Sequence, residues 1–286
     1  QKNSFQHNPP PSFKKRKENL KLILKILSDY KLDWIDAINQ DFGHRSKYET
    51  LLMELMQAQD LIKFVIANLR KWMRPESRRS GLLNFPVRSK IYWQPLGVVG
   101  IISPWNYPID LTISPLVYAL ATGNRVMIKP SEHTPKTSEL LEKLISKYFE
   151  IEHVAVCCGD VDTGIEFSKL PFDHLMFTGS TKTGKLVMGE AAKNLTPVTL
   201  ELGGKSPTII GPDANIPSAA RRICFGKSIN SGQTCIAPDY IFIQKNKVQQ
   251  FVTEYRKSFE KMYPEGEQDQ GYSCLINKFH FERINN

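Results

Sequence analysis

The sequence has few cysteines, and their arrangement excludes two common classes of protein. Its 286 residues include five cysteines, an odd number with no Cys-x-x-Cys pair. Such a set does not indicate a disulfide framework or a zinc site, and it is typical of a reduced, cytoplasmic protein. The six histidines form no pair with an acid at metal-binding spacing, so we expect no metal site.

Long apolar runs are also missing, and so is a visible secretory signal, although the chain begins at Gln1. Because a membrane helix needs about 18 apolar residues, we expect no membrane segment. The net charge of +9 would suit an anionic partner, with basic clusters at 13–21 and 74–80. Aromatic residues do not interleave with these charges, which favours solvated helix faces and a loop, and we expect no nucleic-acid partner.

What the sequence does contain is an alternation of helical patterns and short apolar runs. In the first 75 residues, apolar residues recur at spacings of three and four, which predicts helices. Four later apolar runs end in turn residues and suit strands of a parallel sheet: 96–103, 124–130, 154–160 and 174–180. Helical patterns, clearest at 137–150, separate them. We therefore predict an α/β fold with a doubly wound parallel sheet that binds a dinucleotide, preceded by N-terminal helices.

This pattern divides the chain into two predicted domains. Residues 1–200 hold the N-terminal helices and the dinucleotide-binding domain, with a possible oligomerisation strand at 86–95. Residues 201–286 are expected to form a partial α/β catalytic domain, because the chain turns polar after Gly266 without a closing element. Its predicted elements are helices near 216–228 and 247–262 and a strand at 240–244.

Polar residues follow the predicted strands at the edge where such sheets bind ligands. Asn106 lies in "SPWNYP", where its amide can donate to a developing oxyanion or simply cap the turn. Lys129 and Glu132 lie in "IKPSEHTP" and suit the hydroxyls of a ribose, although Glu132 also suits a helix N-terminus. Both interpretations of Glu132 can hold together.

Two further strand ends carry candidate residues. Gly179 and Ser180 lie in "FTGSTKTG", before a helix whose first N–H groups could bind a pyrophosphate, although a lone Gly-rich turn does not decide this. Glu201 lies in "LELGGK", at what looks like an apolar strand end. Apolar surroundings raise the proton affinity of a carboxylate and suit a general base, but a structural carboxylate fits equally well.

Cys235 lies in "NSGQTCIAPDY", without the apolar neighbours of a structural cysteine or a second metal ligand. Backbone N–H groups in such a small polar turn can favour the thiolate. A nucleophile, an amide donor, a carboxylate base and a dinucleotide site together suit oxidation of a carbonyl through a thioester. Hydrolysis or cofactor binding alone does not need all four.

The motifs also resemble a known family. The segments PWNYP, KPSEHTP, FTGSTKTG, LELGGKSP and GQTCIAPDY occur here in the order found in the aldehyde dehydrogenase superfamily. The resemblance extends from about Asp41 to the end of the chain. The segments "DFGHRS" (41–46) and "NLTPVTLELGGKSP" further resemble the coniferyl aldehyde dehydrogenases of the class 3-like branch.

The resemblance implies a role for each motif residue. Cys235 would be the nucleophile, Glu201 the base that activates the deacylating water, and Asn106 with the Cys235 N–H the oxyanion hole. Tyr107 would contact the substrate. Cofactor contacts would come from residues at the strand ends: Trp105, Lys129, Glu132, Gly179 and Ser180.

The implied reaction is oxidation of an aromatic or medium apolar aldehyde, such as coniferyl aldehyde, to its acid. NAD⁺ would be the cofactor, with NADP⁺ possible, and the full-length protein would be a homodimer. One alternative is an acylating enzyme that passes the thioester to coenzyme A, against which Glu201 argues. Another is a catalytically silent nucleotide-binding fragment, because the family's later Glu-Ile-Phe-Gly-Pro-type motif is absent from this chain.

Overall fold

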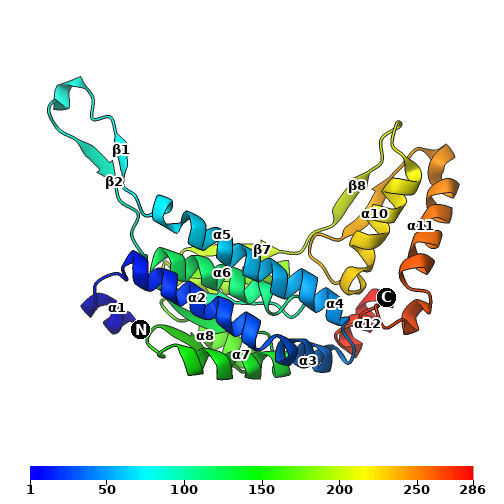
Figure 1. The fold of residues 1–286 in the computed structure, drawn as a ribbon, viewed down its shortest axis with the longest axis horizontal. Coiled ribbons are helices and arrows are strands. Elements are labelled where there is room, and N and C mark those ends of the chain that lie inside the picture. Colours follow the sequence, from blue (N-terminus) through cyan, green and yellow to red (C-terminus); the bar gives the residue numbers. More distant parts are fainter. Residues whose placement is uncertain (286) are drawn as a thin grey trace.

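The N-terminal part of the protein is helical, as the apolar spacing predicts. The computed structural model describes residues 1–285 (Figure 1). The helices are α1 (Lys2–His7), α2 (Phe13–Asp29), α3 (Lys31–Phe42), α4 (Lys47–Thr50) and α5 (Met56–Trp72), with a π-helical turn at Leu51–Leu55 before α5. In α2, Leu20, Ile23 and Leu27 lie on one buried stripe, which packs this helix against the rest of the domain.

A five-stranded parallel sheet follows, in the order β5-β4-β3-β6-β7. The strands are β3 (Val98–Ile102), β4 (Arg125–Lys129), β5 (Val154–Val156), β6 (His174–Gly179) and β7 (Val198–Leu202). The connecting helices are α6 (Asp110–Thr122), α7 (Pro135–Tyr148), α8 (Val161–Ser168) and α9 (Thr181–Ala192). The order runs outward from β3 in both directions, so the predicted doubly wound sheet is confirmed. The switch point lies between β3 and β6, where such sheets bind ligands.

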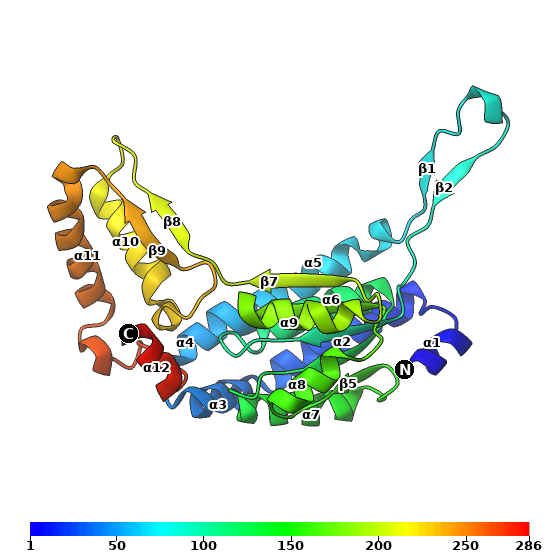
Figure 2. The same ribbon diagram turned by 180° about the vertical axis from the view of Figure 1, so that it is seen from behind.

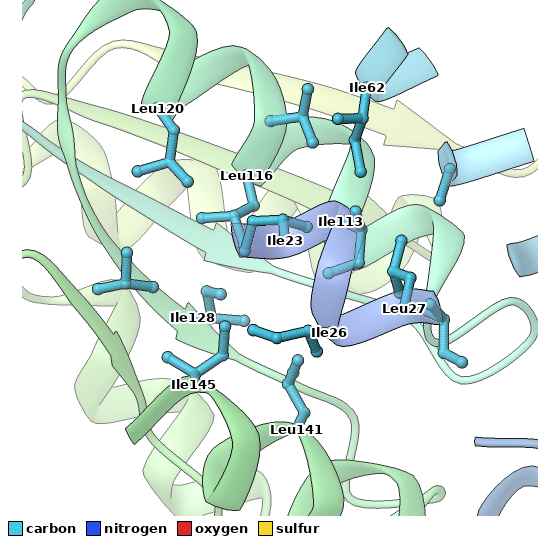
Figure 3. Packing of buried hydrophobic residues seen from close by; sticks show 14 of the residues in the cluster. Ile23, Ile26, Leu27, Ile62, Ile113, Leu116, Leu120, Ile128, Leu141 and Ile145 are labelled. Atoms are coloured by element: carbon cyan, nitrogen blue, oxygen red, sulfur yellow. The ribbon is translucent and has the colours of Figure 1, made fainter. Parts of the chain in front are cut away.

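Helices cover both faces of this sheet. On one face α2, α5, α6 and α7 form the larger apolar core with the strands, and Figure 3 shows Ile23 and Ile26 of α2 beside Leu116 of α6 and Ile128 of β4. On the other face α8 and α9 pack over β6, with Phe177 in the core. Full burial of each such side chain stabilises the folded state by roughly 1.5–3 kcal/mol. The two cores therefore hold the strands in place.

A β-hairpin projects from this body (Figure 1). It pairs β1 (Glu76–Arg78) with β2 (Ser89–Ile91) in antiparallel fashion, and a short 3₁₀ turn at Leu82–Asn84 closes it. The strand predicted at 86–95 is therefore shorter than expected. The side chains of β2 are exposed, and β2 pairs with β1. Few contacts are therefore available to lengthen this strand.

The C-terminal unit is a two-stranded parallel sheet with helices. It contains β8 (Ser206–Ile209), α10 (Ile216–Ser228), β9 (Pro238–Phe242), α11 (Val248–Met262) and α12 (Lys278–Asn285), with 3₁₀ turns at Ile229–Gly232, Lys245–Lys247 and Gly266–Gln268. Figure 2 shows β7 leading from the large sheet to β8. The domain boundary predicted between 200 and 201 falls inside β7, because Glu201 and Leu202 still pair with β6. Within residues 1–285, no helix combines the length and apolar character needed to cross a bilayer.

Candidate active site

The residues singled out from the sequence gather at one edge of the large sheet. Ile102, the last residue of β3, is in register with both Lys129 of β4 and Phe177 of β6. Thr178 of β6 is in register with Glu201 of β7. The carboxyl ends of these four strands therefore form one edge of the sheet. The candidate residues lie at this edge or on the loops that leave it.

Hydrogen bonds join the Asn106 loop to the Cys235 turn. The Asn106 amide donates from Nδ2 to the carbonyl of Gln233 at 3.0 Å. Next to it, the hydroxyls of Tyr107 and Thr234 are 2.8 Å apart. Tyr107 is buried, and burial raises the pKa of its phenol although Thr234 and a nearby arginine oppose this. The structure thus brings the predicted amide donor beside the segment that carries the predicted nucleophile, 127 positions apart in the sequence.

The turn before Cys235 has an unusual backbone. Asn230 and Ser231 have φ angles of 51° and 53°, and Gly232 has 76°. This left-handed region is unfavourable for most residues, and asparagine and glycine tolerate it best. Three successive residues there reverse the chain between α10 and β9 and leave Cys235 exposed. The sequence "NSG" was a readable signal for this turn.

Exposure distinguishes Cys235 from most other thiols of the chain. Burial raises the pKa values of Cys157 and Cys158, the second to about 11, and it also raises that of Cys224. A raised pKa lowers the fraction of reactive thiolate. Only Cys235 and Cys274 are exposed, so these two are the accessible thiols among residues 1–285.

Lys129 and Glu132 form an ion pair after β4. The Lys129 ammonium is almost fully buried and lies 2.9 Å from the Glu132 carboxylate. Burial opposes ionisation of Glu132, but hydrogen bonds from the backbone and from Lys129 outweigh it, so its pKa lies below the ordinary value. The carboxylate is still one-third exposed. A partly exposed anion with a fixed geometry can accept hydrogen bonds from ribose hydroxyls.

A different acid caps the helix that follows. Asp41, at the end of α3, accepts hydrogen bonds from the N–H groups of Lys136 and Thr137, each at 2.8 Å. No side chain of the preceding loop caps α7. Asp41 therefore caps α7 from another element, and the Glu132 carboxylate stays partly exposed at the sheet edge.

Gly179 and Ser180 join β6 to α9 at the switch point. A Cβ on Gly179 would approach the Phe177 ring to 2.6 Å, so a glycine suits this close packing. Ser180 accepts a hydrogen bond from the Thr183 N–H at 3.1 Å and so caps α9. The first turn of α9 thus begins at the same edge, where its N–H groups favour an anion.

Trp105 lies between two elements far apart in the sequence. Its ring centroid is 6.5 Å from that of Phe42 in α3 and 4.7 Å from that of His280 in α12. His280 also contacts His133, which follows Glu132, with centroids 6.0 Å apart. No motif of the sequence indicates that α12 lies beside these two loops.

The prediction that Glu201 has apolar surroundings is wrong. The carboxylate is exposed, and within residues 1–285 it forms no hydrogen bond or ion pair. The cause is its strand: β7 is the last strand of the sheet and alternates partly buried and exposed residues, with Glu201 on the exposed side. Beyond β7, Ser206 is in register with Pro238, which places the loop after Glu201 near the residues after Cys235.

No metal site accompanies these residues in the part of the chain that the structure describes. Among residues 1–285, no three His, Cys, Asp or Glu side chains converge as a metal ion requires. The donors at the edge are instead an amide, a thiol, an ammonium group and carboxylates. This set suits a polar organic ligand and covalent chemistry at sulfur.

Comparison with known proteins agrees with this geometry. The profile of the "Aldehyde dehydrogenase family" matches residues 3–286. The chain belongs to the aldehyde dehydrogenase family. It is 46% identical over 284 residues to a "Probable coniferyl aldehyde dehydrogenase" of Pseudomonas aeruginosa, covering 99% of this chain and 60% of that protein. The chain thus spans about three-fifths of the length of the curated relatives that it matches.

Solved structures of the family share the fold. The "Substrate bound state of Staphylococcus Aureus AldH" matches with a TM-score of 0.95 and 37% identity, over 99% of this chain and 62% of that one. A Mycobacterium tuberculosis aldehyde dehydrogenase "complexed with NAD+" matches with a TM-score of 0.87 and 25% identity, over 99% and 59%. The α/β fold and the family assignment expected from the motifs are therefore confirmed.

Sequence reasoning missed the residues that hold the site loops in place. Gln233 and Thr234 were seen only as part of a polar turn, yet each bonds a residue of the Asn106 loop. Arg45 lies between α3 and α4, Glu49 lies in α4, and charged residues at such positions usually face solvent. The sequence does not show that these two side chains contact each other or that Arg45 is buried.

Proposed function

We propose that the whole protein oxidises an aldehyde to its carboxylic acid with NAD⁺, through a thioester on Cys235. The observation that carries this proposal is the hydrogen bond from the Asn106 amide to Gln233, two residues before Cys235. This bond ties the loop that carries the proposed oxyanion donor to the turn that carries the exposed thiol of Cys235. Similarity to a probable coniferyl aldehyde dehydrogenase supports an aromatic aldehyde such as coniferyl aldehyde as the substrate.

The residues of the sheet edge fit a dinucleotide. Glu132 and Lys129 would hold the adenosine ribose, since a fixed carboxylate suits its two hydroxyls. Gly179 and Ser180, at the start of α9, would lie by the pyrophosphate, and Trp105 would lie beside the cofactor. When bound, NAD⁺ supplies the acceptor for the hydride. Glu132 would repel a 2′-phosphate, so we propose NAD⁺ as the preferred cofactor, with NADP⁺ also accepted.

The chemistry at the substrate falls to residues of this chain. The Cys235 thiolate attacks the carbonyl carbon, and the new C–S bond turns the carbonyl oxygen into an oxyanion. The Asn106 amide, with the Cys235 N–H, stabilises this charge. Loss of hydride restores the C=O bond as a thioester. Glu201 then takes a proton from water, the hydroxide adds to the thioester, and the C–S bond breaks to release the acid and the thiolate.

Two finer assignments belong to this proposal. Tyr107 would border the substrate, because its ring lies on the Asn106 loop and its hydroxyl contacts Thr234, the neighbour of Cys235. The unit that ends with β7 would act as the dinucleotide-binding domain, and the unit from β8 onward would form part of a catalytic domain. The Cys235 turn belongs to the second unit and the Asn106 loop to the first, so the site would lie where the two units meet.

We further propose that the whole protein is a cytoplasmic homodimer. All five cysteines are free thiols, as is typical of a reducing compartment. The hairpin of β1 and β2 exposes Leu82, Leu83, Phe85 and Trp93, a set of apolar side chains that a partner surface would bury. Light scattering would show twice the monomer mass, and a monomer at micromolar concentration would contradict the dimer.

The direct test of the oxidation is NADH formation from coniferyl aldehyde by the purified whole protein. Cys235→Ser should lower kcat by at least about 10⁴-fold, because a serine in its place lacks an activating base. Cys274→Ser changes the other exposed thiol and serves as the matched control, with kcat near that of the unaltered protein. Steady NADH formation by Cys235→Ser at more than a tenth of the control rate would refute the proposed function.

A further inference from the structure

A buried arginine lies behind the proposed active site. Arg45, between α3 and α4, is 1% exposed. Its guanidinium carbon lies 4.7 Å from the centroid of the Phe42 ring and 5.0 Å from that of Tyr107. Its backbone N–H also donates to Asn39 at 2.9 Å. The side chain is therefore held between two aromatic rings and has little freedom to turn.

Among residues 1–285, the one hydrogen bond of this guanidinium goes to the Asn106 loop. Arg45 donates from Nη1 to the carbonyl oxygen of Asn106 at 2.9 Å. The side chain of Asn230 donates to the same oxygen, also at 2.9 Å. Two donors on one carbonyl fix the plane of the peptide from which the Asn106 side chain extends. That side chain is in turn bonded to Gln233, so its amide is fixed at both ends.

Two acidic side chains lie beside the Arg45 guanidinium, and each holds one of the site segments. Glu54 lies 3.5 Å from Arg45 Nη2 and accepts hydrogen bonds from the N–H groups of Ile109 and Asp110, which follow the Asn106 loop. Glu49 lies 3.7 Å from Arg45 Nε and accepts the N–H of Asn230 at 3.0 Å. Arg45 thus lies between Glu54, which binds the Asn106 loop, and Glu49, which binds the Cys235 turn.

The Cys235 turn needs such anchoring. Ser231 holds a left-handed φ angle that serine seldom adopts, directly after Asn230 in the same region, and such a backbone persists only where surrounding contacts determine it. The Asn230 side chain shares the Asn106 carbonyl with Arg45, and its backbone N–H bonds the Glu49 carboxylate. Removal of the guanidinium would leave the buried Glu54 and the partly buried Glu49 without their cationic neighbour, and the carbonyl of Asn106 with one donor.

We propose that Arg45 is a positioning residue for the oxidation, which fixes the Asn106 amide in the orientation that receives the oxyanion at Cys235; this role rests on the proposed function. Arg45 is buried and so offers no surface to a ligand; it would act through the carbonyl of Asn106. A buried ion pair of this kind contributes little net stability compared with apolar side chains, so its value lies in fixing one arrangement of two loops.

A double-mutant cycle in the whole protein tests this role. Arg45→Met keeps much of the volume and should lower kcat by about tenfold to 10²-fold, the cost of a slightly misplaced catalytic group. Affinity for NAD⁺, read from fluorescence quenching, should stay within about twofold. In an Asn106→Ala background the same change should cost about twofold or less, because the amide through which Arg45 acts is absent. Equal losses of kcat in both backgrounds would refute the positioning role.

Arg16→Met is the matched control, since Arg16 is also buried but bonds the carbonyls of Pro11 and Ala121, near the opposite end of α6 from the Asn106 loop. It should leave the Asn106 dependence of kcat unchanged. If Arg45→Met does not fold, Arg45→Lys enters the same cycle with the same deciding outcomes.

A second readout does not depend on activity. Hydrogen exchange measured by mass spectrometry should be faster in segment 103–112 of Arg45→Met and unchanged there in Arg16→Met. Unchanged exchange in Arg45→Met would contradict the role of Arg45. If the unaltered protein oxidises no aldehyde, the proposed function fails, and this exchange measurement alone decides whether Arg45 fixes the loop.

Discussion

The Asn106 loop and Glu201 reach the same sheet edge in very different settings. Asn106 and its neighbours are tied by hydrogen bonds to the Cys235 turn and, through its carbonyl, to the buried Arg45. Glu201 extends from the last strand of the sheet, exposed and without a side-chain partner among residues 1–285. One region is fixed by buried polar contacts, and the other by strand register alone.

This difference separates the two halves of the proposed reaction. Attack by Cys235 and stabilisation of the oxyanion depend on groups whose geometry is already set within this chain. Such preorganised donors stabilise charge without further rearrangement. Deacylation depends on Glu201, whose position comes from the pairing of Thr178 with Glu201 in β7. The comparison predicts that substitutions in the two regions affect different steps of turnover and different properties of the fold.

The largest separation should come from Glu201→Gln, which keeps the shape of the side chain and removes the base. Steady turnover should fall by about 10²–10⁴-fold, the usual value of general-base assistance. The first turnover should still release up to one NADH per site, because hydride transfer precedes deacylation. Stopped-flow absorbance resolves this burst from the slow phase that follows. Undiminished steady turnover would remove Glu201 from the mechanism.

Asn106→Ala should affect the other half of the reaction. Loss of one oxyanion donor typically costs about 10²–10³-fold in kcat. The burst should slow together with steady turnover, and NAD⁺ affinity should change little. Asn194→Ala, which removes an exposed amide bonded to Lys169, is the control and should leave kcat unchanged. A loss of cofactor affinity with normal kcat would show that Asn106 only caps its turn.

The buried contacts behind Asn106 should also make stability depend on pH through Glu54. Burial raises the pKa of this carboxyl to about 7 from 4.5, although Arg45 and two backbone N–H groups oppose the shift and Asp110 adds to it. The folded protein therefore keeps a proton that the unfolded chain has lost. Between pH 4.5 and 7, the free energy of unfolding should fall as the pH rises, by up to roughly 3 kcal/mol.

Urea unfolding of the whole protein at several pH values measures this slope. Glu54→Gln cannot ionise and should lose most of the fall, so the difference between the two proteins isolates the contribution of Glu54. An identical pH dependence in both would contradict the raised pKa.

The smallest effect is expected at the cofactor. Glu132→Gln removes the negative charge beside Lys129 and leaves that ammonium free to attract a 2′-phosphate. The ratio of kcat/KM for NADP⁺ to that for NAD⁺ should rise by about tenfold, equivalent to about 1.4 kcal/mol. Glu139 is an exposed residue of α7 that pairs with Lys136, and Glu139→Gln should leave the ratio unchanged. An unaltered protein that prefers NADP⁺ would refute the role assigned to Glu132.

The sequence was sufficient to predict the parallel sheet and the presence of the motif residues at its edge. Short apolar runs that end in turn residues predicted β3, β4, β5 and β6, and parallel pairing then fixed which edge carries Asn106, Lys129 and Glu132. The exposure of Glu201 was not predictable, because "LELGG" does not show that β7 is the last strand of the sheet. The burial of Arg45 was equally unpredictable, since a charged residue in a short connection between two helices normally faces solvent.

The most direct test of the central claim is mass spectrometry of Glu201→Gln in the whole protein, quenched during turnover of coniferyl aldehyde with NAD⁺. In the proposed reaction the covalent intermediate forms on Cys235, and its slow hydrolysis follows hydride transfer. An acyl group with the mass of the oxidised substrate should therefore accumulate on the peptide that contains Cys235, and not on the peptide that contains Cys274. NADH formation with no acyl group on Cys235, or with the acyl group on another residue, would contradict the account.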